Sequence, residues 1–249
     1  MLEVCVEDPS LVSPDALRAA GEEAGIAYSI CGAFGRDRDL AHEDPERRQN
    51  ALDYLDRLFA LAAAVGSPHV CGPAYSAVGK ERRPDDARPA ERARVVDGLK
   101  EAAERAAGYG VLLALEPLNR YETDLVNTAE QGVELCDEIG ADNVGLLLDT
   151  YHLNIEEKSV GDALRLAGDR LFHVHACEND RGTPGTGHVP WDEVFAALRD
   201  VGYDRQLVLE SFTPLVKEIA RAVSLWRPLD AEGDALAAGG YRFLHRQLF

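Results

Sequence analysis

The sequence predicts an α/β fold, a single (β/α)₈ TIM barrel over residues 1–249. Short runs rich in Val, Ile and Leu alternate with longer segments of helical periodicity, roughly every 25 to 35 residues. The apolar runs are nearly continuous, which is typical of strands covered on both faces in a parallel sheet or a closed barrel. No linker or low-complexity tract divides the chain, and its length is sufficient for one large, well-buried domain.

Seven segments have the pattern of buried strands. They cover residues 2–7, 26–34, 68–75, 111–116, 144–149, 171–176 and 206–211. A complete barrel of this kind has eight βα units. Because the first strand begins at residue 2, we expect the first βα unit to be the one without a counterpart.

Helices are predicted between these strands, over residues 13–25, 46–66, 89–110 and 128–140, and a further helix from Pro190. Ser13, which precedes a proline, and Thr128 are typical N-terminal caps, whereas Gly66 and Gly140 are typical of the position just after a helix.

The composition limits the partners of the protein. Lys and Arg number 26 and Asp and Glu 44, so the formal net charge is 26 − 44 = −18. Such a charge repels phosphate backbones and anionic lipid, which argues against nucleic-acid and membrane partners. No secretory leader is recognisable, and the five cysteines form no paired motif, so we expect a cytoplasmic protein with reduced thiols.

Four of the predicted strands end on a side chain that can bind a metal ion: Glu116, Asp149, His175 and Glu210. A lone acid after a strand is usually a helix cap, but four such groups in successive units suggest a common site. The carboxyl ends of the strands are the face on which barrels of this type build their active sites. Three carboxylates and one imidazole suit Mn²⁺, Mg²⁺ or Co²⁺ better than a structural zinc ion.

Three further side chains follow these strands and are candidates for binding a substrate. Glu122 comes after Glu116, His152 after Asp149, and Arg181 after His175. We expect each of the three to lie in the loop that leaves its strand, where it can bind substrate hydroxyl groups without binding the metal.

The motifs LEPLNRYE, LLLDTYHLNIEE, HVHACENDR and GHVPW together resemble the D-tagatose 3-epimerase family, which includes D-allulose (D-psicose) and L-ribulose 3-epimerases. This family belongs to the xylose-isomerase-like TIM barrels. The resemblance is strongest over residues 111–212. It implies a metal-dependent isomerase that interconverts the C3 epimers of a free ketose, of the D-fructose/D-allulose, D-tagatose/D-sorbose or L-ribulose type, through an enediolate.

The resemblance also assigns roles to the candidate residues. It implies that Glu116, Asp149, His175 and Glu210 hold a divalent ion, with Mn²⁺ first and Co²⁺ or Mg²⁺ as alternatives. By the same resemblance, Glu116 and Glu210 are the two acid/base residues, and Glu122, His152 and Arg181 hold O1, O2 and O3 of the sugar. It implies a homodimer or homotetramer. Members of the family have a first strand that brings an aromatic residue to the sugar pocket, and no counterpart of that strand is recognised here.

Other functions share the fold. An inosose isomerase or dehydratase, or a hydroxypyruvate isomerase, could use the same ligand set, because all pass through an enediol. A non-catalytic relative that binds metal or sugar is a further alternative. The net charge and the total of seven His argue against a barrel nuclease with several metal ions. A Schiff-base aldolase needs a lysine at a strand end, but the lysines are predicted in loops or helices: Lys80, Lys100, Lys158 and Lys217.

Overall fold

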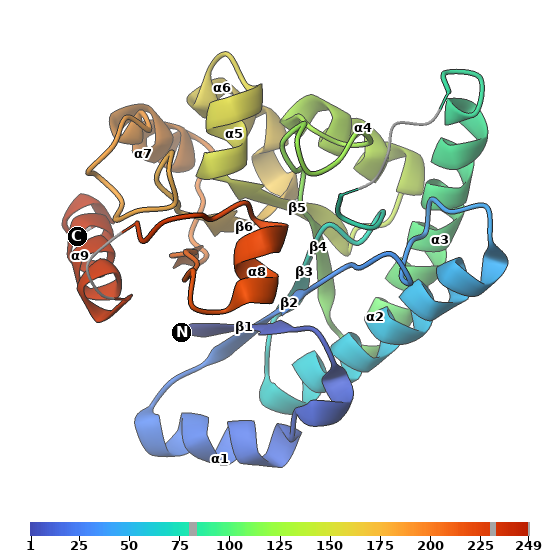
Figure 1. Cartoon of the computed structure of the whole chain (residues 1–249), viewed down its shortest axis with the longest axis horizontal. Coiled ribbons are helices and arrows are strands. Elements are labelled where there is room, and N and C mark those ends of the chain that lie inside the picture. Colours follow the sequence, from blue (N-terminus) through green and yellow to red (C-terminus); the bar gives the residue numbers. More distant parts are fainter. Residues whose placement is uncertain (80–83, 230–232, 249) are drawn as a thin grey trace. The chain divides into compact units, whose positions relative to one another are not determined.

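The structure is a computed structural model that describes residues 1–79, 84–229 and 233–248. The chain divides into two compact units, Met1–Leu147 and Leu148–Phe249. Figure 1 shows the elements of the first unit in blue through green and those of the second in yellow through red.

The first unit is built on a parallel sheet with helices between its strands. Its strands are β1 Leu2–Val6, β2 Tyr28–Gly32, β3 His69–Gly72, β4 Leu112–Leu115 and the start of β5 Val144–Asp149. Each strand pairs in parallel with the next one in the sequence. The 3₁₀-helix and the helices are η1 Pro9–Leu11, α1 Pro14–Ala24, α2 Pro45–Val65, α3 Arg88–Tyr109 and α4 Ala129–Ile139. The predicted strands and long helices of this unit are confirmed, with ends that move by a few residues.

The helix ends in this unit are formed by capping residues that the sequence predicts. The Ser13 side chain accepts from the backbone at the start of α1, and Thr128 forms a capping box with Gln131 at the start of α4. Gly66 and Gly140 follow α2 and α4 in the left-handed conformation that glycine adopts at little cost.

Tyr54 of α2 fixes the carboxyl ends of the first two strands. Its ring is fully buried. Its hydroxyl group donates to the carbonyl oxygen of Val6, the last residue of β1, and accepts from the backbone N–H of Ala33, just after β2, at 2.8 Å. One phenol therefore satisfies two backbone groups at the edge where the strands end.

The second unit contains the end of β5 and two further strands. It comprises α5 Thr150–Glu156, α6 Val160–Ala167, η2 Gly168–Arg170, β6 Leu171–His175, α7 Trp191–Asp200, β7 Leu207–Val208, α8 Lys217–Ala222 and α9 Gly233–Leu248. β6 and β7 are parallel, with Val174 opposite Leu207. α7 begins at Trp191 with Pro190 as its cap, as the sequence predicts. The described residues therefore contain the seven strands expected from the sequence.

Among the described residues, no helix combines the length and the apolar character needed to cross a lipid bilayer.

We expect Tyr54→Phe to lower the free energy of unfolding by about 1–3 kcal/mol, because the Ala33 N–H loses its buried acceptor. Urea denaturation measures this loss. Tyr109→Phe is the matched control: Tyr109 is exposed and its hydroxyl donates to Asp56 at 3.3 Å, so its effect should stay within about 0.5 kcal/mol. Equal effects of the two substitutions would contradict the role given to Tyr54.

Candidate active site

The second unit brings together three of the candidate ligands. Asp149 is the last residue of β5, His175 is the last residue of β6, and Glu210 lies two residues after β7. Asp149 and His175 are fully buried, and the Glu210 side chain is 24% exposed. A buried carboxylate is very unfavourable without a positive partner or a full set of hydrogen bonds, so the surroundings of Asp149 decide whether this arrangement is stable.

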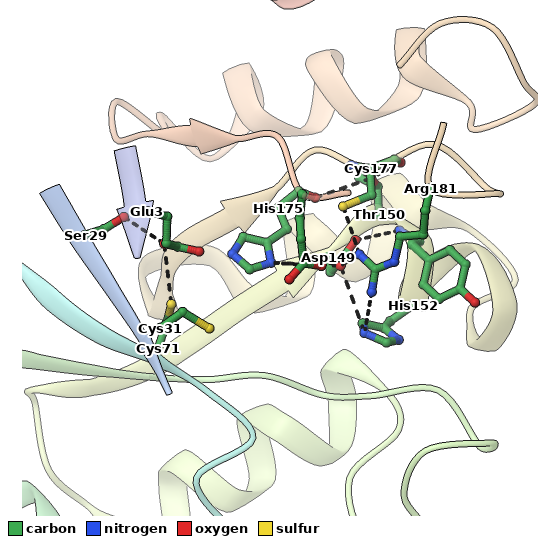
Figure 2. A network of polar contacts seen from close by, with 12 residues as sticks. Glu3, Ser29, Cys31, Cys71, Asp149, Thr150, His152, His175, Cys177 and Arg181 are labelled. Atoms are coloured by element: carbon green, nitrogen blue, oxygen red, sulfur yellow. Dashed lines mark hydrogen bonds and ion pairs between the residues drawn. The ribbon is translucent and has the colours of Figure 1, made fainter. Parts of the chain in front are cut away.

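The partner is Arg181. Its Nη1 donates to Asp149 Oδ2 at 2.5 Å and also to Glu210 Oε2. The same nitrogen lies 3.0 Å from the Sγ atom of Cys177. Figure 2 shows the guanidinium group directed at Asp149 and Cys177, with His152 beside it. One positive nitrogen therefore faces two carboxylates and a sulfur atom.

This cation sets the protonation of its neighbours. Burial alone would raise the pKa of Asp149, but Arg181, with His152 and His175, outweighs it and holds the pKa at about 2. The pKa of His152 is lowered to about 3, because burial and, to a smaller extent, the charges of Arg181 and His175 outweigh the opposing effect of Asp149. At neutral pH, Asp149 is therefore ionised and His152 is a neutral imidazole.

The donor atoms of this group fit a divalent cation. His175 Nδ1 lies 3.9 Å from Asp149 Oδ2 and 3.7 Å from Glu210 Oε2. Asp149, Cys177 and Glu210 each offer one ligand atom, and these three atoms lie within 4.8 Å of one another. Oxygen and imidazole donors at such separations match Mn²⁺, Co²⁺ or Mg²⁺, and Arg181 already holds positive charge at the point where they converge.

Arg181 is itself held from several sides. Its guanidinium carbon lies 4.1 Å from the centre of the Tyr151 ring and 5.2 Å from that of Phe212, both within range of a cation–π contact. Its Nη2 is 3.3 Å from His152 Nε2. Its backbone has φ of 66°, which is unusual for a residue other than glycine and persists only where surrounding contacts over-determine it. Ser211 adds such a contact by donating to the Arg181 carbonyl oxygen at 2.7 Å.

The loop that carries Arg181 is organised by Glu178, which the sequence reading did not identify. The Glu178 carboxylate is fully buried and accepts from the backbone N–H groups of Asn179, Gly185 and Val189, and from the indole N–H of Trp191, at 2.8–3.0 Å. Burial raises its pKa, but these hydrogen bonds outweigh that effect and lower the pKa below its ordinary value. The backbone N–H of Gly185 in this loop thus binds a carboxylate of the chain itself.

Two of the candidates lie in the first unit. Glu116 directly follows β4 and is buried; its N–H donates to the Gly72 carbonyl, and its own carbonyl accepts from the Tyr75 hydroxyl at 2.9 Å. Glu122 lies in the loop after β4, where its carboxylate accepts from the Asn119 side chain at 2.8 Å. Their roles stay predictions of the sequence.

The placement of His152 is a correction. The sequence reading puts it in a loop, but it lies in α5, one turn after Asp149. The cause is Asp149 itself, because its Oδ1 accepts from the Tyr151 N–H at 2.8 Å and so caps the helix directly after the strand. Asp149 therefore combines the ordinary role of a helix cap with a place in the polar group, one oxygen for each.

Cys177 is the other residue that the sequence reading missed at this site. It lies two positions after His175, in the motif HVHACENDR, and is fully buried. Its position just after a strand that ends on a candidate ligand is a sequence feature that indicates a place in the site. The wide spacing of the five cysteines favours instead thiols without a specific role.

Comparison with known proteins identifies the family. Residues 5–229 match the family described as xylose isomerase-like TIM barrel. A probable ketose 3-epimerase of Synechocystis sp. is 33% identical over 98% of this chain and 85% of its own length. L-ribulose 3-epimerase of Mesorhizobium japonicum is 32% identical over 98% of this chain and 82% of its own. The chain belongs to the ketose 3-epimerase family of xylose isomerase-like TIM barrels.

A solved structure supports the same assignment. The D-allulose 3-epimerase of Methylomonas sp., in complex with D-allulose, superposes with a TM-score of 0.94 at 31% identity, over 98% of this chain and 85% of that one. The predicted fold class, an α/β TIM barrel, and the resemblance read from the four motifs are thus both confirmed for this ketose 3-epimerase relative.

We expect Glu178→Gln to destabilise the fold by about 1–3 kcal/mol. An amide offers one acceptor atom in place of two and directs an NH₂ group at backbone donors. Urea denaturation measures the change. The exposed Glu134→Gln is the control and should stay within about 0.5 kcal/mol. A Glu178→Gln protein as stable as the control would contradict the organising role of this carboxylate.

The free energy of unfolding of the metal-free protein should fall as the pH is lowered, because His152 has a lower pKa in the folded than in the unfolded protein. Its pKa is about 3 in the folded protein, whereas an unfolded histidine titrates near 6.5, so the unfolded chain binds the extra proton between these values. From pH 6.5 to 5.5 this effect removes on the order of 1 kcal/mol. The Asp149 contribution is lost only below about pH 4.

Urea midpoints in the presence of a chelator measure this dependence. His152→Gln should reduce the slope between pH 5.5 and 6.5, whereas the exposed His188→Gln should keep the slope of the wild type. An unchanged slope in His152→Gln would show that this imidazole is not held neutral.

Proposed function

We propose that this protein is a divalent-metal-dependent ketose 3-epimerase that interconverts the C3 epimers of a free ketose, of the D-allulose or L-ribulose type. The proposal is supported by the relatives, which carry ketose 3-epimerase names over nearly the whole chain. The main structural observation in its support is that the side chains of Asp149, His175 and Glu210 lie close together, with the positive charge of Arg181 next to both carboxylates.

Under this proposal Asp149, His175 and Glu210 hold the ion, most readily Mn²⁺, and the family resemblance adds Glu116 as the fourth ligand. The bound ion would supply electrostatic stabilisation of the negative charge that develops next to the C2 carbonyl, worth several kcal/mol. The geometry of Asp149, His175 and Glu210 supports the first three assignments, and the resemblance of the LEPLNRYE motif supports Glu116.

The acid and base would be Glu116 and Glu210. As a carboxylate, one takes the proton from C3, and the other, as a carboxylic acid, returns a proton to the opposite face of the resulting enediolate. The two exchange roles when the reaction runs backwards, so no net proton is gained or lost. Of the two carboxylates that Arg181 contacts, Glu210 is the one with part of its side chain exposed, which leaves it accessible for proton transfer.

Substrate binding would fall to Arg181, His152 and Glu122. Arg181 and His152 would polarise the carbonyl side of the sugar. Arg181 would act as a permanently charged cation, and His152 as a neutral imidazole that can donate or accept a hydrogen bond. Glu122 would fix a terminal hydroxyl group, and its hydrogen bond from Asn119 holds the carboxylate in place.

The alternative isomerases differ from a 3-epimerase in the product that they form. A hydroxypyruvate or inosose isomerase could use the same carboxylates and ion, so the product is what separates them from a 3-epimerase. Among the described residues, no lysine lies at a strand end as an aldolase would need: Lys100 lies in α3, Lys217 begins α8 and Lys158 lies between α5 and α6. Lys80 lies outside the described residues.

The compartment and assembly are also proposals. All five cysteines are thiols and not disulfides, which supports a reducing compartment such as the cytoplasm. The family resemblance supports a homodimer or homotetramer.

We expect Glu116→Gln and Glu210→Gln each to lower the rate of C3 epimerisation by about 10²–10⁴-fold, because each removes one of two proton-transfer groups. Incubation with D-fructose, D-allulose and L-ribulose, followed by chromatography, measures the C3 epimers and any aldose product. Glu138→Gln, which changes a surface partner of Arg92, is the control and should retain activity. Substantial 3-epimerase activity in both active-site variants would rule out the two-base scheme, and an aldose product alone would favour the isomerases.

Removal of metal should abolish activity, and Mn²⁺ should restore it. Mn²⁺ at a hundredfold excess over its Kd should also stabilise the folded protein by about 2.7 kcal/mol. Thermal unfolding with and without Mn²⁺ measures this effect, and Asp149→Asn should lose most of it because a neutral amide replaces a charged carboxylate ligand. If chelation left both activity and unfolding temperature unchanged, the metal assignment would fail.

A further inference from the structure

Cys177 places a sulfur atom where the carboxylates converge. Arg181 Nη1 has three acceptors in the second unit: Asp149 Oδ2 at 2.5 Å, Glu210 Oε2, and Cys177 Sγ at 3.0 Å. The three acceptor atoms lie within 4.8 Å of one another. The guanidinium nitrogen thus marks a point at which a cation is held by two oxygens and one sulfur.

Thr150 holds the backbone of the residue that carries this sulfur. The Thr150 hydroxyl group accepts from the Cys177 N–H at 2.8 Å and donates to the Cys177 carbonyl oxygen at 2.6 Å. Thr150 is fully buried and directly follows Asp149, so one residue ties the end of β6 to the start of α5. These two hydrogen bonds hold the backbone of Cys177 beside Thr150, the residue that follows Asp149, and the sulfur lies close to Arg181 Nη1.

A sulfur donor changes which ions the site prefers. Carboxylates alone suit hard ions such as Mg²⁺ and Mn²⁺, whereas a thiolate among them favours Zn²⁺, Cd²⁺ and Co²⁺. The ligand set implied by the sequence contains only oxygen and imidazole donors, so it does not account for this thiol.

We propose that Cys177 is a sulfur ligand of the metal centre, in addition to Asp149, His175 and Glu210, and that the centre therefore binds thiophilic divalent cations. The inference rests on the proposed function, since it concerns the same centre. When such an ion binds, the S–H bond is broken, a sulfur–metal bond forms and the proton passes to solvent. The guanidinium nitrogen of Arg181 leaves the point that the ion takes.

The test is titration of the metal-free protein with Co²⁺ up to one equivalent. A thiolate bound to Co²⁺ gives a sulfur-to-metal charge-transfer band in the near ultraviolet, which oxygen ligands do not give. We expect this band in the wild type and its loss in Cys177→Ser.

Cys71→Ser is the matched control. Cys71 is also a buried thiol beside a carboxylate, 3.6 Å from Glu3 Oε2, and Figure 2 shows this pair within the first unit. The band should persist in Cys71→Ser. Its persistence in Cys177→Ser, or its absence from the wild type, would overturn the inference.

Metal affinity gives a second measurement. Cys177→Ser should weaken Cd²⁺ binding by on the order of tenfold or more, with Mn²⁺ binding close to that of the wild type. If Cys177→Ser fails to fold, Cys177→Ala takes its place, and X-ray absorption of the wild type with one equivalent of Zn²⁺ should show a sulfur neighbour at about 2.3 Å. A spectrum with oxygen and nitrogen neighbours alone contradicts the inference.

The two proposals can fail separately. If no ketose is epimerised but the Co²⁺ band forms and depends on Cys177, the proposed function falls and the sulfur ligand stands. If ketoses are epimerised and no sulfur band forms, the sulfur ligand falls and the proposed function stands.

Discussion

The second unit depends on the ion pairs that Arg181 makes with Asp149 and Glu210. A fully buried carboxylate at the end of β5 would be very unfavourable alone, and the guanidinium group stabilises it while joining it to Glu210. Removing one partner of a buried ion pair typically costs about 3–5 kcal/mol. The rest of the local structure secures this cation: Glu178 organises its loop, Ser211 holds its backbone, and Tyr151 and Phe212 flank its guanidinium group.

The two carboxylates that share Arg181 differ in burial, and the proposed reaction makes use of this difference. Asp149 is fully buried with a pKa of about 2, so it remains an anion near neutral pH and is suited to holding a cation. An efficient acid/base residue must gain and lose a proton near the working pH, which Asp149 does not. Glu210 shares the cation but is partly exposed, so of these two carboxylates it is the one suited to proton transfer in the proposed reaction.

The sequence predicts much of this arrangement because its main signals are local. The strand ends at Asp149 and His175 follow directly from apolar runs that stop on a polar group, and the caps at Thr128 and Gly140 follow from turn chemistry. The contact of Arg181 with Asp149 joins residues 32 positions apart through a folded loop, so no spacing rule reveals it. The loop depends on Glu178, whose hydrogen-bond partners extend to residue 191. The sequence does not predict the position of Cys177 for the same reason, because the contact of its sulfur with Arg181 forms only in the folded loop.

A crystal of this protein grown with Mn²⁺ tests the metal assignment through the position of the bound ion. We expect an anomalous peak bonded by Asp149, His175 and Glu210, joined by Glu116. A peak bonded by other residues, or these side chains ordered around Arg181 with Mn²⁺ in excess and no ion among them, would contradict it.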